Sequence, residues 1–268
     1  MRIRLIDAFT DRPFGGNVAG VCVVDEWPAD ERMQHVADEL GAPMTAFVRG
    51  AGDELDLRWF MPGNGEQPIC GHATLAAAHA LAEDRGAPVD VRFSTLSGVH
   101  PARTADDGAI TIEFPLAPVT EIPAPDGLVD ALGATPAETH YAERFPDVIA
   151  VFGSEDEVRA LAPDFAKLGA LSRRDKLRGV TATAPAADAR PYDFASRFFS
   201  PGDGIDEDPV TGSAHCALAP YWATRLGRNA MTGLQASART GLVGCELKGE
   251  RVALTGRAVT VLDGELRQ

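Results

Sequence analysis

The chain has 268 residues, and 25 Lys and Arg against 39 Asp and Glu give a formal net charge of −14. Apolar residues make up 45% and charged residues 24% of the sequence, which argues against disorder or a fibrous repeat. The acid excess argues against nucleic acid or an anionic membrane surface as the main partner, because both are bound through clustered Lys and Arg.

The cysteines argue against a disulfide scaffold, because there are only four of them, and no two form a CxxC pair that would suggest structural zinc. Charges interrupt the N-terminal residues before a signal peptide can form, and no stretch approaches the roughly 20 apolar residues of a membrane span. We therefore expect a cytoplasmic protein. We also expect no cofactor and no metal, since the sequence has no dinucleotide fingerprint, phosphate loop or metal cluster.

Short runs of β-branched and aromatic residues, separated by Gly and Pro, predict mostly strands. In chain order they are Arg2–Phe9, Val18–Val24, Thr45–Val48, Leu55–Phe60, Val89–Ser94, Ala109–Phe114, Val148–Phe152, Gly179–Ala184, Pro191–Phe199, Arg251–Leu254 and Arg257–Leu262. The Pro-rich segment after Pro118 looks like a crossing connection. It divides the chain into an N-terminal lobe, 1–118, and a C-terminal lobe, 119–268, whose last strand can cross to the other lobe.

Four helices are expected between these strands. They are Glu31–Leu40, capped by Asp30 and ended by Gly41; a helix from about His72 to Glu83; a short helix through Leu161 with a Ser154/Glu157 capping box; and a helix from about Ser213 to before Gly227, which Pro220 should kink or end early.

An internal repeat organises the sequence. Phe60-Met61-Pro62 is followed nine residues after Pro62 by Gly71, and Phe199-Ser200-Pro201 is followed eleven residues after Pro201 by Gly212. Each Gly begins an Ala-rich helical stretch, and the two lie 141 residues apart, about half the chain. The repeat predicts two lobes of similar build, each presenting a helix start.

A helix start offers unpaired backbone N–H groups and a partial positive charge, and Gly permits close approach. Two such ends facing each other would grip an anionic small molecule such as a carboxylate. The alternative is that the two glycines only allow a helix to pack closely on a sheet. Titratable groups gather at both starts, and Asp208, which is followed by Pro209 and held next to the Gly212 turn, is placed to act as a general acid or base.

These residues resemble the phenazine-biosynthesis (PhzF-like) isomerases. The resemblance runs nearly end to end and rests on ordered motifs, namely Asp7–Asn17, Cys70–Ala76, Asp206–His215, Gln235–Ser237 and Arg257–Val261. It implies an α+β fold like that of diaminopimelate epimerase, with two pseudo-symmetric lobes, each a curved and mostly antiparallel sheet around a central helix. It also implies a homodimer and a cofactor-independent isomerase, which moves a proton and a double bond in a small carboxylate-bearing metabolite, as in secondary metabolism.

One position departs from the family. A Glu that shuttles the proton usually stands where this chain has Met44, and methionine cannot carry a proton. A loop that is one residue longer than the family's could also bring Glu66 towards the site. Met44 leaves two further functions open, which are epimerase-type chemistry with Cys70 as a base and a non-catalytic small-molecule binding protein.

The candidate site follows from the motifs and the resemblance together. Asp208, His72 and Cys70 are the catalytic candidates, although His72 can equally cap the helix or orient substrate, and Cys70 can be a packing residue. The substrate-binding candidates are Gly71, Gly212, Ser213, Met44 and Asn17. His79, further along the first of the two helices, is expected to be structural.

Overall fold

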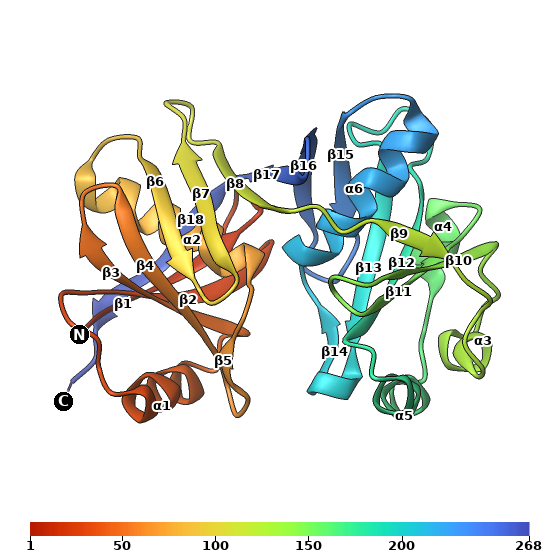
Figure 1. The fold of residues 1–268 in the computed structure, drawn as a ribbon, viewed down its shortest axis with the longest axis horizontal. Helices are drawn as coiled ribbons and strands as arrows, with labels where there is room; N and C mark the ends of the chain where they lie inside the picture. Colours follow the sequence, from red (N-terminus) through yellow and green to blue (C-terminus); the bar gives the residue numbers. More distant parts are fainter. Residues whose placement is uncertain (268) are drawn as a thin grey trace. The chain divides into compact units, whose positions relative to one another are not determined.

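The computed structural model describes residues 1–267. The chain forms two compact units (Figure 1). Unit 1 contains Met1–Phe114 and the C-terminal residues from Ala253 onward, and unit 2 contains Pro115–Val252. The C-terminal strand therefore belongs to the same unit as the N-terminus.

Unit 1 is a sheet with two helices. Its elements are β1 (Arg2–Ala8), β2 (Asn17–Val24), α1 (Asp30–Leu40), β3 (Met44–Ala51), β4 (Glu54–Met61), β5 (Gly65–Gln67), α2 (Gly71–Arg85), β6 (Asp90–Thr95), β7 (Gly98–Thr104), β8 (Ile110–Pro115) and β18 (Ala258–Glu265). Strand β17 (Arg251–Gly256) begins in unit 2 and ends in unit 1.

Unit 2 carries more short helices. Its elements are β9 (Val119–Glu121), α3 (Leu128–Leu132), β10 (Glu138–Ala142), β11 (Asp147–Val151), α4 (Glu155–Ala160), α5 (Phe165–Asp175), β12 (Gly179–Pro185), β13 (Phe194–Ser200), the 3-10 turn η1 (Pro201–Asp203), β14 (Ile205–Asp208), α6 (Gly212–Leu226), β15 (Ala230–Gln235) and β16 (Gly241–Lys248).

Strand pairing follows the same order in both units. In unit 1, β2 pairs parallel with β3, β3 antiparallel with β4, and β4 parallel with β6. In unit 2, β11 pairs parallel with β12, β12 antiparallel with β13, and β13 parallel with β15. The strand that precedes each set is also paired on both sides. In unit 1, β1 lies between β2 and β18, and in unit 2, β10 lies between β11 and β9. The sequence repeat is thus a repeat of topology.

Each unit holds one long helix among its strands, α2 in unit 1 and α6 in unit 2 (Figure 1). Ten of the 15 residues of α2 and eleven of the 15 residues of α6 are buried, so neither helix keeps a broad solvent-facing side. The many alanines let the backbone lie close to the surrounding strands. The expected α+β fold, with a central helix in each lobe, is confirmed.

Two expectations about helix ends need correction. Asp30 is the first residue of α1 rather than its cap, because the N-cap residue is Ala29 and no side chain caps the helix. Asp30 instead accepts a hydrogen bond from Arg58. Of the two effects expected of Pro220, the early end is wrong, because helix α6 continues to Leu226 and so ends before Gly227 as predicted. By contrast, Ser154 caps α4 as expected, accepting from the Glu157 N–H.

Candidate active site

The start of α6 is held by a hydrogen-bonded group of three residues, which we call the Asp208 network: Asp208, Thr211 and Gln235. Asp208 ends β14 and is only 9% exposed. Its Oδ2 accepts from the Thr211 hydroxyl at 2.5 Å. Gln235 of β15 donates to the Asp208 backbone carbonyl at 2.7 Å and accepts from the Thr211 N–H at 2.8 Å. The Asp208 carboxylate is therefore fixed before the first turn of the helix.

His215, a buried residue of α6, also contacts the first turn of that helix. Its Nδ1 lies 2.9 Å from the Thr211 carbonyl oxygen, so Nδ1 carries the proton and donates. The residue is fully buried, and desolvation lowers the pKa of its imidazole to about 4. At neutral pH His215 is an uncharged structural donor.

Ser213, the second residue of α6, accepts a hydrogen bond from a half-buried arginine. Nη1 of Arg178 lies 2.5 Å from its Oγ. The other edge of the guanidinium binds Asp147, which is completely buried, through Nε at 2.9 Å and through Nη2. Burial alone would lower the pKa of Arg178, but the Asp147 carboxylate outweighs that effect and raises it. The site thus includes a permanent positive charge.

The start of α2 in unit 1 carries a different set of side chains. Cys70 is its N-cap residue, and its Sγ lies 3.5 Å from Nδ1 of His72. Nδ2 of Asn17, the first residue of β2, lies 3.3 Å from the same nitrogen. Because an amide NH₂ can only donate, Nδ1 accepts and the ring proton is on Nε2. Desolvation lowers the pKa of His72 to about 3, so the neutral ring offers an N–H donor.

Met44 begins β3, pairs with Ala19 of β2 and is 8% exposed. Its buried thioether cannot take a proton. The carboxylate of Glu66 is engaged by an arginine, because both of its oxygens accept from Arg58, at 2.8 and 2.6 Å.

The predicted site residues thus fall into two half-sites. The unit 1 half-site holds Asn17, Cys70, Gly71 and His72, and the unit 2 half-site holds Asp208, Gly212 and Ser213. Gly71 and Gly212 are the first residues of their helices, as the repeat predicts. The sequence reasoning missed Arg178 and Asp147, and it noted Gln235 only as part of a motif.

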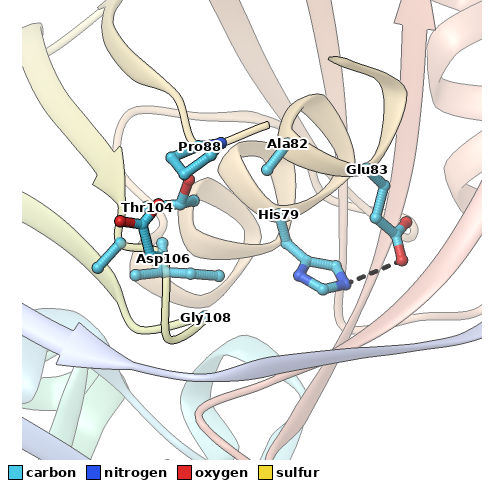
Figure 2. A pocket seen from close by; sticks show the side chains of 9 residues that line it. His79, Ala82, Glu83, Pro88, Thr104, Asp106 and Gly108 are labelled. Carbon is cyan, nitrogen blue, oxygen red and sulfur yellow. Dashed lines mark ion pairs between the residues drawn. The ribbon is translucent and has the colours of Figure 1, made fainter. Parts of the chain in front are cut away.

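Within unit 1, a cavity of about 300 Å³ lies between α2 and the β7–β8 hairpin. Figure 2 shows His79 and Glu83 on its helical wall, opposite Thr104 and Asp106. His79 Nε2 pairs with Glu83 at 3.2 Å, and Glu83 also accepts from the Thr260 hydroxyl. No residue of either half-site lines this cavity, so we do not assign the chemistry to it.

Among residues 1–267, no three His, Cys, Asp or Glu side chains gather as a metal site would require. No helix in the described part of the chain is both long and apolar enough to cross a membrane.

Comparison with known proteins agrees with this architecture. Residues 6–264 match the sequence profile of the family described as phenazine biosynthesis-like proteins. An uncharacterized isomerase of Pseudomonas aeruginosa is 44% identical over 263 residues, covering 97% of this chain and 96% of the relative. The human phenazine biosynthesis-like domain-containing protein is 34% identical over 288 residues, covering 98% of each.

Solved structures show the same fold. A PhzF family protein of Enterococcus faecalis superposes with a TM-score of 0.90 at 34% identity, covering 100% of this chain and 99% of that one. A hydroxyproline epimerase of Agrobacterium vitis shares the fold alone, with a TM-score of 0.64 at 14% identity, 98% of this chain and 91% of that one being covered. The chain therefore belongs to the phenazine biosynthesis-like family, whose relatives include proteins named isomerases.

Proposed function

We propose that this member of the phenazine biosynthesis-like family is a cofactor-independent isomerase, which moves a proton and a double bond within a small carboxylate-bearing metabolite of secondary metabolism. The family and the isomerase names of its relatives support the reaction class. The observation that carries the proposal is the Asp208 network, because it holds a nearly buried carboxylate at a helix start before any substrate binds.

In each unit the helix start, at Gly71 or at Gly212, offers backbone N–H groups to an anionic group of a substrate, and in unit 2 Ser213 adds its hydroxyl. Asn17 and Met44 complete the binding surface of unit 1.

Asp208 takes a proton from one carbon, and the electron pair left behind forms a new double bond as the old one shifts. The protonated Asp208 exchanges its proton with solvent and then delivers a proton to the carbon at the far end of the shifted system, so Asp208 ends the cycle ionised. A single group can serve both steps when they occur on one face of the substrate. His72 enters as a neutral N–H donor that stabilises developing negative charge and can relay a proton. Met44 then needs no catalytic role.

Epimerisation with Cys70 as a base is the second candidate, because the thiol lies 3.5 Å from the His72 ring. Inverting one carbon requires proton donors and acceptors on opposite faces. The repeat puts Thr211 at the position that corresponds to Cys70, and a hydroxyl is not ionised at neutral pH. A second thiol is therefore missing, and we favour the isomerase. Undiminished turnover by Cys70→Ala would remove this candidate.

Solvent-deuterium incorporation tests the proposal. The protein is incubated in heavy water with unsaturated cyclic amino acids and dihydroanthranilate-like acids, and mass spectrometry reports carbon-bound deuterium. We expect uptake by the wild-type chain and a loss of at least about 100-fold in Asp208→Asn. Asp206→Asn is the matched control, because Asp206 lies on the same strand but is exposed.

Full exchange by Asp208→Asn would overturn the assignment of the base. Tight binding without exchange by the wild-type chain would instead identify a binding protein. The homodimer implied by the resemblance and the cytoplasmic location expected from the sequence remain predictions, and light scattering in solution measures the oligomeric state.

A further inference from the structure

We propose that Arg178 is the residue that recognises the carboxylate of the substrate, acting together with the Ser213 hydroxyl. This inference rests on the proposed function, which requires an acidic substrate but names no positively charged side chain that binds the acid. The contacts that carry the inference all lie within unit 2.

The first argument is the geometry of the guanidinium. Asp147 fixes one edge of Arg178 through Nε and Nη2, and the ring of Phe198 lies beneath it, 4.9 Å from the guanidinium carbon. Nη1 is directed to Ser213 at the start of α6. An arginine held at three sides loses little side-chain entropy when it binds an anion.

The second argument is the position that the repeat gives this arginine. Thr45 of β3 pairs with Phe60, and Val180 of β12 pairs with Phe199. Since Phe60 and Phe199 correspond in the repeat, Met44 corresponds to Gly179, the residue directly after Arg178. In the same repeat His72 corresponds to Ser213, the helix residue to which Arg178 donates. Arg178 of unit 2 therefore lies one residue before the position that corresponds to Met44 of unit 1.

The third argument is the direction of the Ser213 proton. Its oxygen accepts from Arg178, so the hydroxyl can still donate its own proton to an acceptor. A carboxylate at the helix start would accept that proton together with backbone N–H groups. The Arg178 side chain remains 26% exposed, and only three of its five N–H donors are engaged by Asp147 and Ser213. Two N–H donors of this guanidinium are therefore not used by Asp147 or Ser213.

A purely structural role is the competing explanation, because removing Arg178 would strand the fully buried Asp147 carboxylate. The two roles differ in what they predict for ligands. A structural arginine affects the stability of the protein and treats an acid and its amide alike, whereas a recognition arginine discriminates between them.

The experiment is calorimetric titration with 2-aminobenzoate and cyclohex-1-enecarboxylate, each beside its own amide. We expect the wild-type chain to prefer each acid over its amide by more than tenfold. Arg178→Lys keeps a positive charge but loses the planar guanidinium with its paired N–H donors. This variant should bind the acids about tenfold more weakly. The amide affinities should stay within twofold. Arg159→Lys is the matched control, because Arg159 also pairs with a buried carboxylate of unit 2, that of Glu155.

Two further variants keep the test valid if Arg178→Lys fails to fold. Asp147→Asn/Arg178→Gln removes both charges together, and Ser213→Ala leaves the ion pair intact. We expect the first to abolish the preference for acid and the second to reduce it several-fold. Equal acid affinity in the folded variants and the wild type, or no preference for acid in the wild type, would overturn the inference. Acid binding that depends on Arg178 without deuterium exchange would instead overturn only the proposed function.

Discussion

At the scale of single residues, the two half-sites are built around buried and uncharged imidazoles. His72 and His215 both lie in the first turns of the central helices, and burial lowers the pKa of each. A protonated ring there would add charge next to the partial positive charge of a helix start. Neutral rings give N–H donors without that cost, which suits sites that we expect to bind anions.

The lowered pKa of His215 predicts an acid-sensitive fold. The unfolded imidazole gains its proton near pH 6.5, whereas the folded one resists until about pH 4. Stability from this residue is therefore complete above about pH 6.5 and falls as the pH decreases to about 4, by about 3 kcal/mol in total. Urea unfolding of the wild type and His215→Asn at several pH values measures the difference. The exposed His35→Asn is the control, and identical pH slopes in wild type and His215→Asn would contradict the prediction.

At the scale of elements, helices α1 and α4 begin differently, although each has a residue near its start that could cap it, Asp30 and Ser154 respectively. Ser154 accepts from the Glu157 N–H at the start of α4, while α1 begins with no side-chain cap. We expect Ser154→Ala to lower the free energy of unfolding by about 1 kcal/mol, because it leaves a helix N–H without its partner. Asp30→Ala should cost less than about 0.5 kcal/mol, since only an exposed ion pair with Arg58 is lost. Denaturant titration compares them, and an equal loss would contradict the cap assignments.

Helix starts were the elements most predictable from sequence. Gly71 and Gly212 mark them because a glycine after a turn and before an alanine-rich stretch is a local signal, and the structure begins α2 and α6 at these residues. Helix α5 was missed although Asp164 caps it, and β14 was missed because its four residues, Ile205–Asp208, are mostly acidic. Short or polar elements are stabilised by neighbours distant in sequence, which local patterns do not contain.

The absence of distant contacts from local sequence patterns also explains which residues of the candidate site could be predicted. The motifs identified Asp208 and Ser213 by their position at a helix start. Arg178 and Asp147 became visible only in three dimensions, because parallel pairing of β11 with β12 brings together residues 31 positions apart. An arginine before a strand has no distinctive local pattern. The repeat relates Arg178 to the neighbour of Met44 only once the pairing of the strands is known.

At the scale of the whole molecule, the two units differ in how the chain builds them. Unit 2 is one continuous segment, Pro115–Val252, whereas unit 1 needs its C-terminal segment from Ala253 onward. Strand β1 pairs with β18 along its whole length, from Arg2 to Ala8. Unit 1 therefore cannot be completed until the end of the chain is available.

This difference predicts that the units have unequal independence. A fragment of residues 115–252 contains its own apolar core, including Phe152, Leu168 and Phe199, and should unfold cooperatively by itself. A fragment of residues 1–114 leaves one edge of β1 without its partner and should aggregate or remain unfolded. Adding the missing strand as a peptide of residues 253–268 should restore a cooperative transition. Circular dichroism during thermal unfolding measures the two fragments and the mixture of fragment 1–114 with the peptide. A fragment 1–114 that folds without the peptide would show that β18 is dispensable. A fragment 115–252 without a cooperative transition would show that the repeat is one of topology and not of independent folding.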